Sequence, residues 1–432
     1  GFLSFNALDV EPLRDLGNGI SLGVLFAFIY TIFFIAPLIS FLDIKIPTST
    51  QQQINLSRKL AIFSLSSGKT FLWTIPLICF LLILLIPLNK LEMNPTQMYS
   101  EKYTSFGPDV LWLDKKLGAS FPISFKATSD NGSVSNPRFL EGLDNFSIWL
   151  EEQKEVTHVT SLARTMKSLN KSMHGDDLKM KVIPEDQELS SQYLFFYEMS
   201  LPMGLDLNTS ISQDRGSTRI AATLREMTSK EYLIFDEKVA EYLRENNLES
   251  IISKPAGFRV IFVYLMEAIV NSLLVGVTIG LALIITVIGF FFRSASFGFL
   301  SSFPNILPIV SAFGIWAIID GQIDFMVAVG MGSTLGIIVD FTVHLLSKYD
   351  LARQELKKSP EDAVLFAFEA VGFALIAMTI ILALGFSVLH LVSFLPMHNF
   401  AQFSILAFVF ALIIDFFLFP NLLVRFDKRK FD

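Results

Sequence analysis

The sequence contains very little cysteine and histidine. Its 432 residues include one cysteine, Cys79, which lies within an apolar run, and five histidines. A single cysteine excludes an intrachain disulfide framework and a cysteine-based metal site, and the histidines are scattered without the spacing of metal ligands. The sequence also lacks a P-loop, so nothing in it indicates that this chain hydrolyses ATP. We therefore expect no metal, no cofactor and no enzyme activity.

Charged residues are scarce as well. They make up 17% of the chain, whereas hydrophobic residues make up 52% and phenylalanine alone occurs 43 times. This composition is typical of an integral membrane protein. The net charge of −7 gives no indication of nucleic-acid binding. We expect membrane lipids as partners and no nucleic acid.

Seven apolar runs are long enough to cross about 30 Å of hydrocarbon at about 1.5 Å per helical residue. They cover residues 19–42, 71–88, 261–292, 297–319, 325–346, 364–391 and 400–424. Residues 51–69 form a basic, amphipathic stretch of the kind that lies along the membrane interface. The pattern predicts a polytopic α-helical membrane protein.

Residues 90–258 carry most of the charge and contain no run that could span a membrane. Alternating apolar residues predict strands at 121–127 and 217–224, and helical spacing predicts helices at 137–153, 188–199 and 230–246. A short β-branched run, 156–159, leads into another helix at 162–169. This order predicts an α+β domain of the ferredoxin-like, βαβ type.

Positive charge is concentrated in alternate loops, which lie on one side of the membrane. Lysine and arginine cluster at residues 58–69, 293, 348–358 and 425–430. Loops rich in these residues remain in the cytoplasm. The domain at 90–258 is therefore expected on the periplasmic or extracellular side of the cell (inner) membrane.

Asp340 is the most informative residue because it lies within the apolar run 325–346. A charged carboxylate in hydrocarbon costs several kcal/mol, so such an acid is a functional-site hypothesis, here a proton relay. His344 is four residues further and shares its helix face. A structural hydrogen bond is the alternative role for Asp340, and a structural or interfacial role is the alternative for His344.

Other residues were assigned roles around this acid. One flank of the same helix carries only small residues at Gly330, Gly332 and Gly336, which should let another helix approach closely. We therefore expect the Asp340 face to point into a bundle. Thr379, in the next run, could donate a hydrogen bond to Asp340. Asp320 and Asp324 are expected to be solvated loop charges.

The chain also contains an internal repeat. Residues 1–39 align with residues 385–423, with identities that include Gly1/Gly385, Phe2/Phe386 and Pro12/Pro396. This predicts two copies of a unit of roughly 380 residues, related by an axis along the membrane normal. We expect that most of the first copy is absent here, so that a missing amino-terminal half or a second chain completes the protein.

Together these motifs resemble the carboxy-terminal half of an exporter of the resistance-nodulation-division (RND) superfamily, in the branch with the MMPL lipid transporters. Residues 336–346, Gly-Ile-Ile-Val-Asp-Phe-Thr-Val-His-Leu-Leu, are similar to the signature Gly-x-x-Val-Asp-Tyr-x-x-His-Leu. Three other features agree with this family: the strand-to-helix step at 159–162, the Gly-Phe and Pro of the last two runs, and the Pro-Asn-Leu-Leu at 420–423. Two departures are Phe341, where the family has tyrosine, and Phe373, where arginine is frequent.

The resemblance implies half of a pseudo-two-fold RND fold with a periplasmic porter domain. The expected domains are the end of a first-half transmembrane bundle (1–42), a cytoplasmic linker (43–70), a transmembrane helix (71–89), the porter-like domain (90–258), a five-helix bundle (259–426) and a cytoplasmic tail (427–432). The implied function is proton-driven export of lipids or other hydrophobic or amphiphilic molecules. The signature places the relay on Asp340, with His344 beside it.

Two other functions fit the same fold. The first is a sterol-sensing, Patched-like regulator that binds lipid without transport, and the second is an accessory subunit of protein translocation. A homo-oligomer is a further arrangement that the sequence allows.

Overall fold

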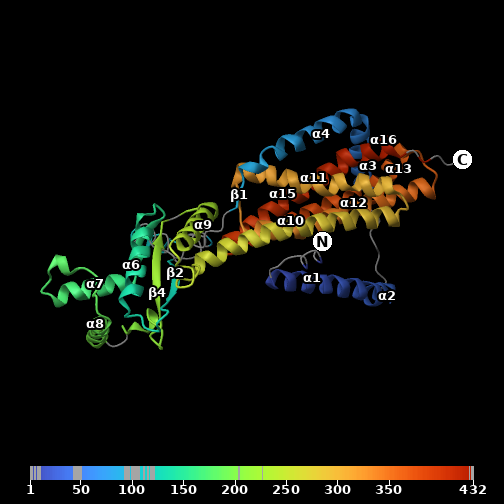
Figure 1. The fold of residues 1–432 in the computed structure, drawn as a ribbon. Coiled ribbons are helices and arrows are strands. Elements are labelled where there is room, and N and C mark those ends of the chain that lie inside the picture. The colour runs from blue at the N-terminus through green and yellow to red at the C-terminus, as the bar shows by residue number, and fades with distance from the viewer. Residues whose placement is uncertain are drawn as a thin grey trace. The chain divides into compact units, whose positions relative to one another are not determined.

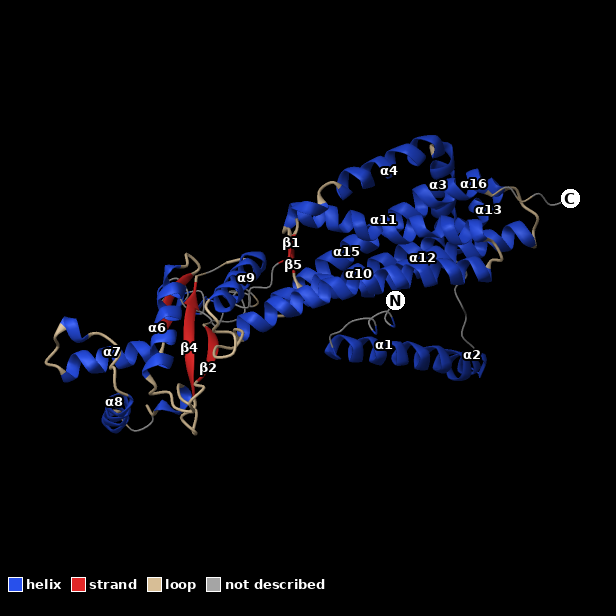
Figure 2. Ribbon diagram, viewed as in Figure 1, coloured by secondary structure: helices blue, strands red, loops and turns tan. Residues whose placement is uncertain are grey.

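The computed structural model describes residues 11–41, 51–91, 122–202, 205–225 and 227–427, together with isolated positions such as 429, and leaves the side chains of 12, 13, 16 and 270–274 undescribed. The chain divides into a membrane unit, Gly1–Glu92 with Met266–Asp432, and a second unit, Met93–Leu265. Figure 1 shows the elements of both units, and Figure 2 shows that helices predominate.

Six helical stretches in the described residues are long and apolar enough to span a membrane. They are Gly17–Phe41, Gly68–Leu88, Ala295–Ile319, Phe325–Gln354, Pro360–Leu391 and Leu395–Phe426. The prediction of a polytopic membrane protein is therefore confirmed. The seventh predicted span, 261–292, falls in helix α10 (Phe258–Phe291), whose described apolar part, Val275–Phe291, is shorter.

Two long helices form the centre of the membrane unit. Helix α12 (Phe325–Gln354) packs against α15 (Leu395–Ile413), and both pack against α11 (Ala295–Ile319). Around them lie α3 (Gln51–Ser66), α4 (Gly68–Ile83), α13 (Pro360–Ala367), α14 (Phe373–Ser387) and α16 (Phe419–Phe426). Fully buried aromatic side chains, including Trp316, Phe341 and Phe403, fill the space between the central helices.

Three membrane segments contain a π-helical turn, at η2 (Thr31–Ile35), η7 (Phe368–Gly372) and η9 (Ile414–Leu418). Two of them correspond in the internal repeat. The succession α1 (Glu11–Tyr30), η2 and α2 (Ala36–Phe41) matches α15, η9 and α16, and the alignment of 1–39 with 385–423 places Thr31 opposite Asp415. The two copies thus share an irregularity of the backbone as well as sequence identities.

Glycine allows α11 to approach its neighbours closely. A Cβ added to Gly314 would overlap the carbonyl oxygen of Leu82 at the end of α4, and one added to Gly298 would lie 2.6 Å from the carbonyl oxygen of Ile285 in α10. Because both obstacles are backbone atoms, a methyl group can be accommodated only if the helices separate.

We expect Gly314→Ala to lower the free energy of unfolding by about 1–3 kcal/mol, the usual result of overpacking a close contact. Thermal unfolding of the detergent-solubilised protein measures this loss. The matched control is Gly23→Ala in α1, where a Cβ would meet nothing within 4 Å. An equal loss in both variants would show that helix separation is not the cause.

The second unit is a small mixed α/β domain. Strands β2 (Ile123–Thr128), β4 (Ser217–Leu224) and β3 (Val156–Thr160) form a sheet in the order β2-β4-β3, with β4 antiparallel to both neighbours. Bridges from Ile252 and Ala256 extend the free edge of β2. Helix α6 (Pro137–Glu152) connects β2 to β3, and α9 (Ser229–Glu245) follows β4.

This order is a β-α-β unit split by an inserted strand, and a second helix leads back to the sheet edge. Helices α7 (Leu162–Met173) and α8 (Gln187–Ser200) lie in the connection between β3 and β4. The predicted strands and helices agree with the structure to within about two residues at each end, except that α7 continues to Met173, beyond the predicted end at 169. A capping box of Thr228 and Glu231 fixes the start of α9, and the Asn136 side chain caps α6.

Candidate functional site

The start of α12 is fixed by a buried acid. The Asp324 carboxylate accepts hydrogen bonds from the backbone amides of Met326 and Val327 at 2.8 and 2.9 Å, and from Asn399 Nδ2 at 2.8 Å. The prediction that Asp324 is a solvated loop charge is therefore wrong. Burial raises its pKa, and these hydrogen bonds act in the opposite direction. Asp320 is exposed, as predicted.

Asp340 and His344 form a pair on the surface of α12. His344 Nε2 lies 3.4 Å from Asp340 Oδ1, and both side chains are 53% exposed. The opposite face of α12, with Ile338, Phe341 and Thr342, is the buried one. The helices that the structure describes thus enclose the Phe341 face and leave the Asp340 face uncovered. The bundle into which the Asp340 face is expected to point is not formed by these helices.

Thr379 does not join this pair. It is buried in α14 and donates to the Leu375 carbonyl oxygen of its own helix at 2.9 Å. The predicted hydrogen bond to Asp340 is not made among the described residues, because Asp340 points away from the buried side of α12.

The three glycines of α12 have different surroundings. A Cβ at Gly330 would lie 3.2 and 3.3 Å from the rings of Phe400 and Phe403, so this glycine lets α15 approach closely. Gly332 is buried in the same region. A Cβ at Gly336 would meet nothing within 4 Å, so this position is open near the Asp340 face.

A second intramembrane acid was missed from the sequence. Asp415, in η9, is fully buried, and its Oδ1 lies 3.2 Å from the hydroxyl of Thr342 on the inner face of α12. The same hydroxyl lies 3.2 Å from Asn305 Oδ1 on α11. Asp340 was identified because it is an acid within an apolar run. The same criterion identifies Asp415, which lies within the run 400–424.

The far end of α12 is tied to the chain's last described residues by a buried ionic cluster. Arg353 Nε donates to Asp427 Oδ2 at 2.8 Å, and the Tyr349 hydroxyl donates to the same oxygen at 2.9 Å. Arg429 Nε donates to Asp427 Oδ1 at 2.9 Å and its Nη1 to Asp350 Oδ1 at 2.5 Å. The predicted cytoplasmic tail therefore begins with residues that hold the end of α12.

The membrane unit also contains an apolar cavity of about 350 Å³. Its walls come from α10, α11 and α12, with Leu281, Phe313 and Met331 among the lining residues, and from the segment after α4, with Ile86 and Leu91. Such a cavity can hold an acyl chain or another apolar group, and the described residues that line it are all apolar.

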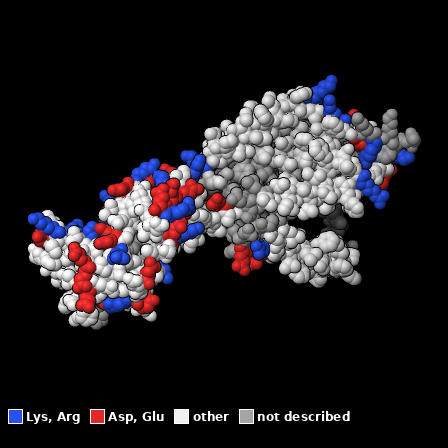
Figure 3. Space-filling view, in the orientation of Figure 1, with Lys and Arg blue, Asp and Glu red and all other residues white. Residues whose placement is uncertain are grey.

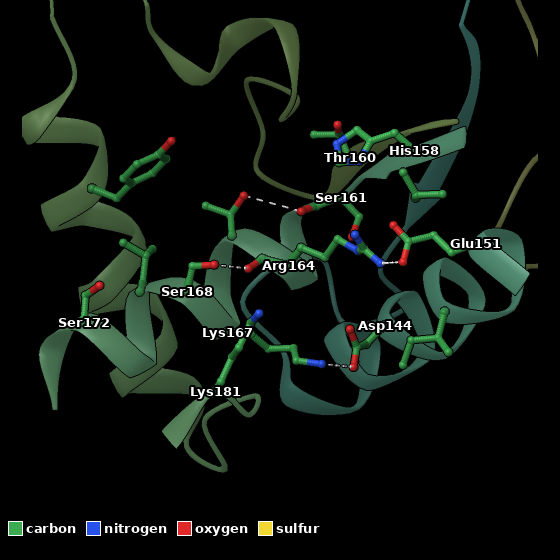
Figure 4. A pocket seen from close by; sticks show the side chains of 15 residues that line it. Asp144, Glu151, His158, Thr160, Ser161, Arg164, Lys167, Ser168, Ser172 and Lys181 are labelled. Carbon is green, nitrogen blue, oxygen red and sulfur yellow. Dashed lines mark hydrogen bonds and ion pairs between the residues drawn. The ribbon is translucent and has the colours of Figure 1, made fainter. Parts of the chain in front are cut away.

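The second unit has a larger, polar cavity of about 690 Å³ beside β3, α6 and α7 (Figure 4). Lys167 Nζ contacts Asp144 Oδ2 at 2.8 Å, and Arg164 forms an ion pair with Glu151. His158 and Lys181 also line the cavity. Four of its charged side chains are thus matched in two ion pairs, and the cavity offers hydrogen-bonding groups for binding.

Comparison with known proteins places these features in a family. A protein from Methanocaldococcus jannaschii that is named only as a membrane protein is 29% identical over 154 residues, which are 35% of this chain and 39% of that relative. The match thus spans about two fifths of the relative's length. The MMPL family matches residues 137–430, from α6 to the C-terminal ionic cluster, and this region contains Asp340, His344 and Asp415. The chain therefore belongs to the MMPL family of the RND superfamily.

Proposed function

We propose that this MMPL family membrane transporter exports lipids or other hydrophobic or amphiphilic molecules, driven by the proton-motive force, and that Asp340 carries the proton. The observation that supports this most strongly is the Asp340–His344 pair. It places two groups that can exchange a proton 3.4 Å apart on a membrane-spanning helix. A carboxylate in hydrocarbon is stable only when protonated, paired or hydrated, so its protonation can follow alternating access.

The uncovered position of this pair supports a second bundle as its partner. A polar face in a membrane has to be covered by protein or by a water-filled cavity. The repeat, with π-helical turns in both η2 and η9, supports a pseudo-two-fold arrangement in which another copy of the unit supplies the covering helices. A missing amino-terminal half or a second chain, including a second copy in a homo-oligomer, would place its own polar groups opposite Asp340.

The apolar cavity supports a hydrophobic cargo. With about 350 Å³ and walls of aliphatic and aromatic side chains, it matches the apolar part of a lipid better than a hydrophilic solute.

The charge distribution supports the proposed orientation. Figure 3 shows lysine and arginine gathered at the end of the membrane unit where Figure 1 labels α3, α13 and α16. Arg58, Lys59 and Lys69, of α3 and the start of α4, are exposed. By the positive-inside rule this end lies in the cytoplasm. The mixed α/β domain follows the opposite end of α4 in the chain and would be periplasmic or extracellular.

Efflux of a fluorescent lipid from sealed vesicles that contain the full-length protein tests this function. With an imposed pH gradient we expect efflux, and a protonophore that collapses the gradient should stop it. A lipid-binding regulator or a translocation subunit would leave lipid movement unchanged by either treatment, and that result would overturn the proposal.

A further inference from the structure

The cluster of Asp415, Thr342 and Asn305 lies in the core of the membrane unit, on the other side of α12 from Asp340. All three residues are fully buried and come from three different elements, η9, α12 and α11. Thr342 is two residues from Asp340, which is about 200° of rotation around a helix. Helix α12 therefore carries Asp340 on its outer face and contacts Asp415 through Thr342 on its inner face.

Counting hydrogens shows that the cluster has too few donors. The amide nitrogen of Asn305 donates to the Ser301 carbonyl oxygen at 2.7 Å, so its Oδ1 faces Thr342. The Thr342 hydroxyl carries one hydrogen but lies 3.2 Å from both Asn305 Oδ1 and Asp415 Oδ1. Asp415 Oδ2 is buried with no hydrogen-bond partner among the described residues. Three acceptor oxygens thus share one hydrogen.

One added proton reduces this shortage. If Asp415 carries a proton on Oδ1, it can donate to Thr342 Oγ1, and the Thr342 hydroxyl is then free to donate to Asn305 Oδ1. Both separations of 3.2 Å are longer than an ordinary O–H···O hydrogen bond of about 2.5–3.0 Å, and a distance between two oxygens does not determine which of them donates. Protonation also removes the buried, unpaired charge, which would otherwise cost several kcal/mol.

Within the described residues, no charged group lies close enough to Asp415 to replace this proton. Helix α11 has no charged residue, and on α12 the charges nearest in sequence to Thr342, Asp340 and His344, lie on the opposite, half-exposed face. The cations of α3, α4 and α16 are exposed, namely Arg58, Lys59, Lys69 and Arg425. Asp350 and Arg353 belong to the C-terminal ionic cluster, and His398 of α15 binds the Val392 carbonyl oxygen at 2.6 Å.

The backbone around the cluster is interrupted in two of the three elements. Asp415 lies in a π-helical turn, a feature that is frequent at functional sites. Pro304 and Pro308 flank Asn305 in α11 and cannot donate to the carbonyls four residues earlier. Interrupted membrane helices form the ion-binding sites of many secondary transporters, because they place polar groups at membrane depth.

We propose that Asp415 is a second proton-binding site of the membrane unit, which holds a proton in the arrangement described here and exchanges it during the transport cycle. This inference deepens the proposed proton coupling, but its first test does not require transport. Thr342 acts as a positioning residue that links the protonation of Asp415 to the helix carrying Asp340.

Dicyclohexylcarbodiimide tests the inference, since it reacts with protonated carboxylic acids in apolar surroundings and leaves a stable N-acylurea. Membranes that contain the intact protein would be labelled over a range of pH, with and without added NaCl, and modified peptides would be located by mass spectrometry. We expect label on Asp415, with a labelling rate that falls about tenfold per pH unit once the group loses its proton. Added NaCl should not protect Asp415.

The outcomes separate this inference from the proposed function. Label on Asp415 but none on Asp340 would support the inner site and count against the outer relay. If Asp415 stays unlabelled under turnover conditions, the inference that it exchanges a proton is overturned. If NaCl protects Asp415 from labelling, the site binds sodium in place of a proton. Asp415→Asn, which keeps the shape of the side chain, should lose label at this peptide and retain whatever label Asp340 takes.

Discussion

Asp340→Asn is expected to abolish the cargo gradient that the proton-motive force maintains. One proton that moves through 100 mV supplies about 2.3 kcal/mol, which corresponds to an accumulation ratio of about 50-fold per coupled proton. Asparagine keeps the size of the side chain but cannot bind and release the proton. The steady-state gradient of a fluorescent lipid across vesicles with the full-length protein measures this loss.

The matched control for this variant is Glu361→Gln. Glu361 is an exposed acid in the first turn of α13, so its replacement also removes one carboxylate from the membrane unit but none from α12. It should keep the gradient unchanged. If Asp340→Asn is folded and still supports a gradient equal to that of the unaltered protein, Asp340 is a structural residue and the relay assignment fails.

Asp427→Ala is expected to lower the free energy of unfolding by about 3–5 kcal/mol, the usual result of leaving a buried charge without its partner. Arg353, only 4% exposed, would lose the carboxylate at 2.8 Å that neutralises it. Arg429 would lose the same partner, and the chain's last described residues would no longer hold the end of α12. Chemical denaturation of the detergent-solubilised protein measures the change.

A surface ion pair provides the comparison. Arg58 and Glu369 are 3.5 Å apart, but the Arg58 side chain is 60% exposed. Arg58→Gln should therefore change the stability by less than about 1 kcal/mol. A loss in Asp427→Ala no larger than this would show that the C-terminal ionic cluster does not stabilise the membrane unit.

The same carboxylate makes stability depend on pH. Burial alone would raise the pKa of Asp427, but hydrogen bonds from Arg429, Arg353 and Tyr349 outweigh it and hold the pKa well below the ordinary value. A carboxyl whose pKa is lower in the folded state stabilises the protein above its unfolded pKa, near 4. This contribution should be lost as the pH falls below that value, and Asp427→Ala should show a weaker loss.

The sequence predicted the positions of most elements because they depend on local patterns. Six of the seven spans expected from apolar runs are present, and the alternation of apolar residues predicted the ends of β2 and β4 to within about two residues. It also identified Asp340, since an acid in an apolar run is visible without a structure.

The directions of side chains could not be predicted in the same way. Position in a run indicates the depth of a residue in the membrane, whereas its direction depends on which neighbours pack against the helix. Asp340 and Thr342 are two residues apart, yet one is half exposed and the other is buried against Asp415. Asp324 appeared to be a loop charge because its partner, Asn399, is distant in sequence and contacts it only in the fold.

Proton movement that accompanies cargo movement tests the central claim most directly. Vesicles with the full-length protein would carry a pH-sensitive dye inside, and a gradient of lipid cargo would be imposed without any gradient of protons. We predict that cargo flow down its gradient drives protons in the opposite direction, and that Asp340→Asn abolishes this proton movement. Cargo flow through the unaltered protein without any change of internal pH would contradict proton coupling through Asp340.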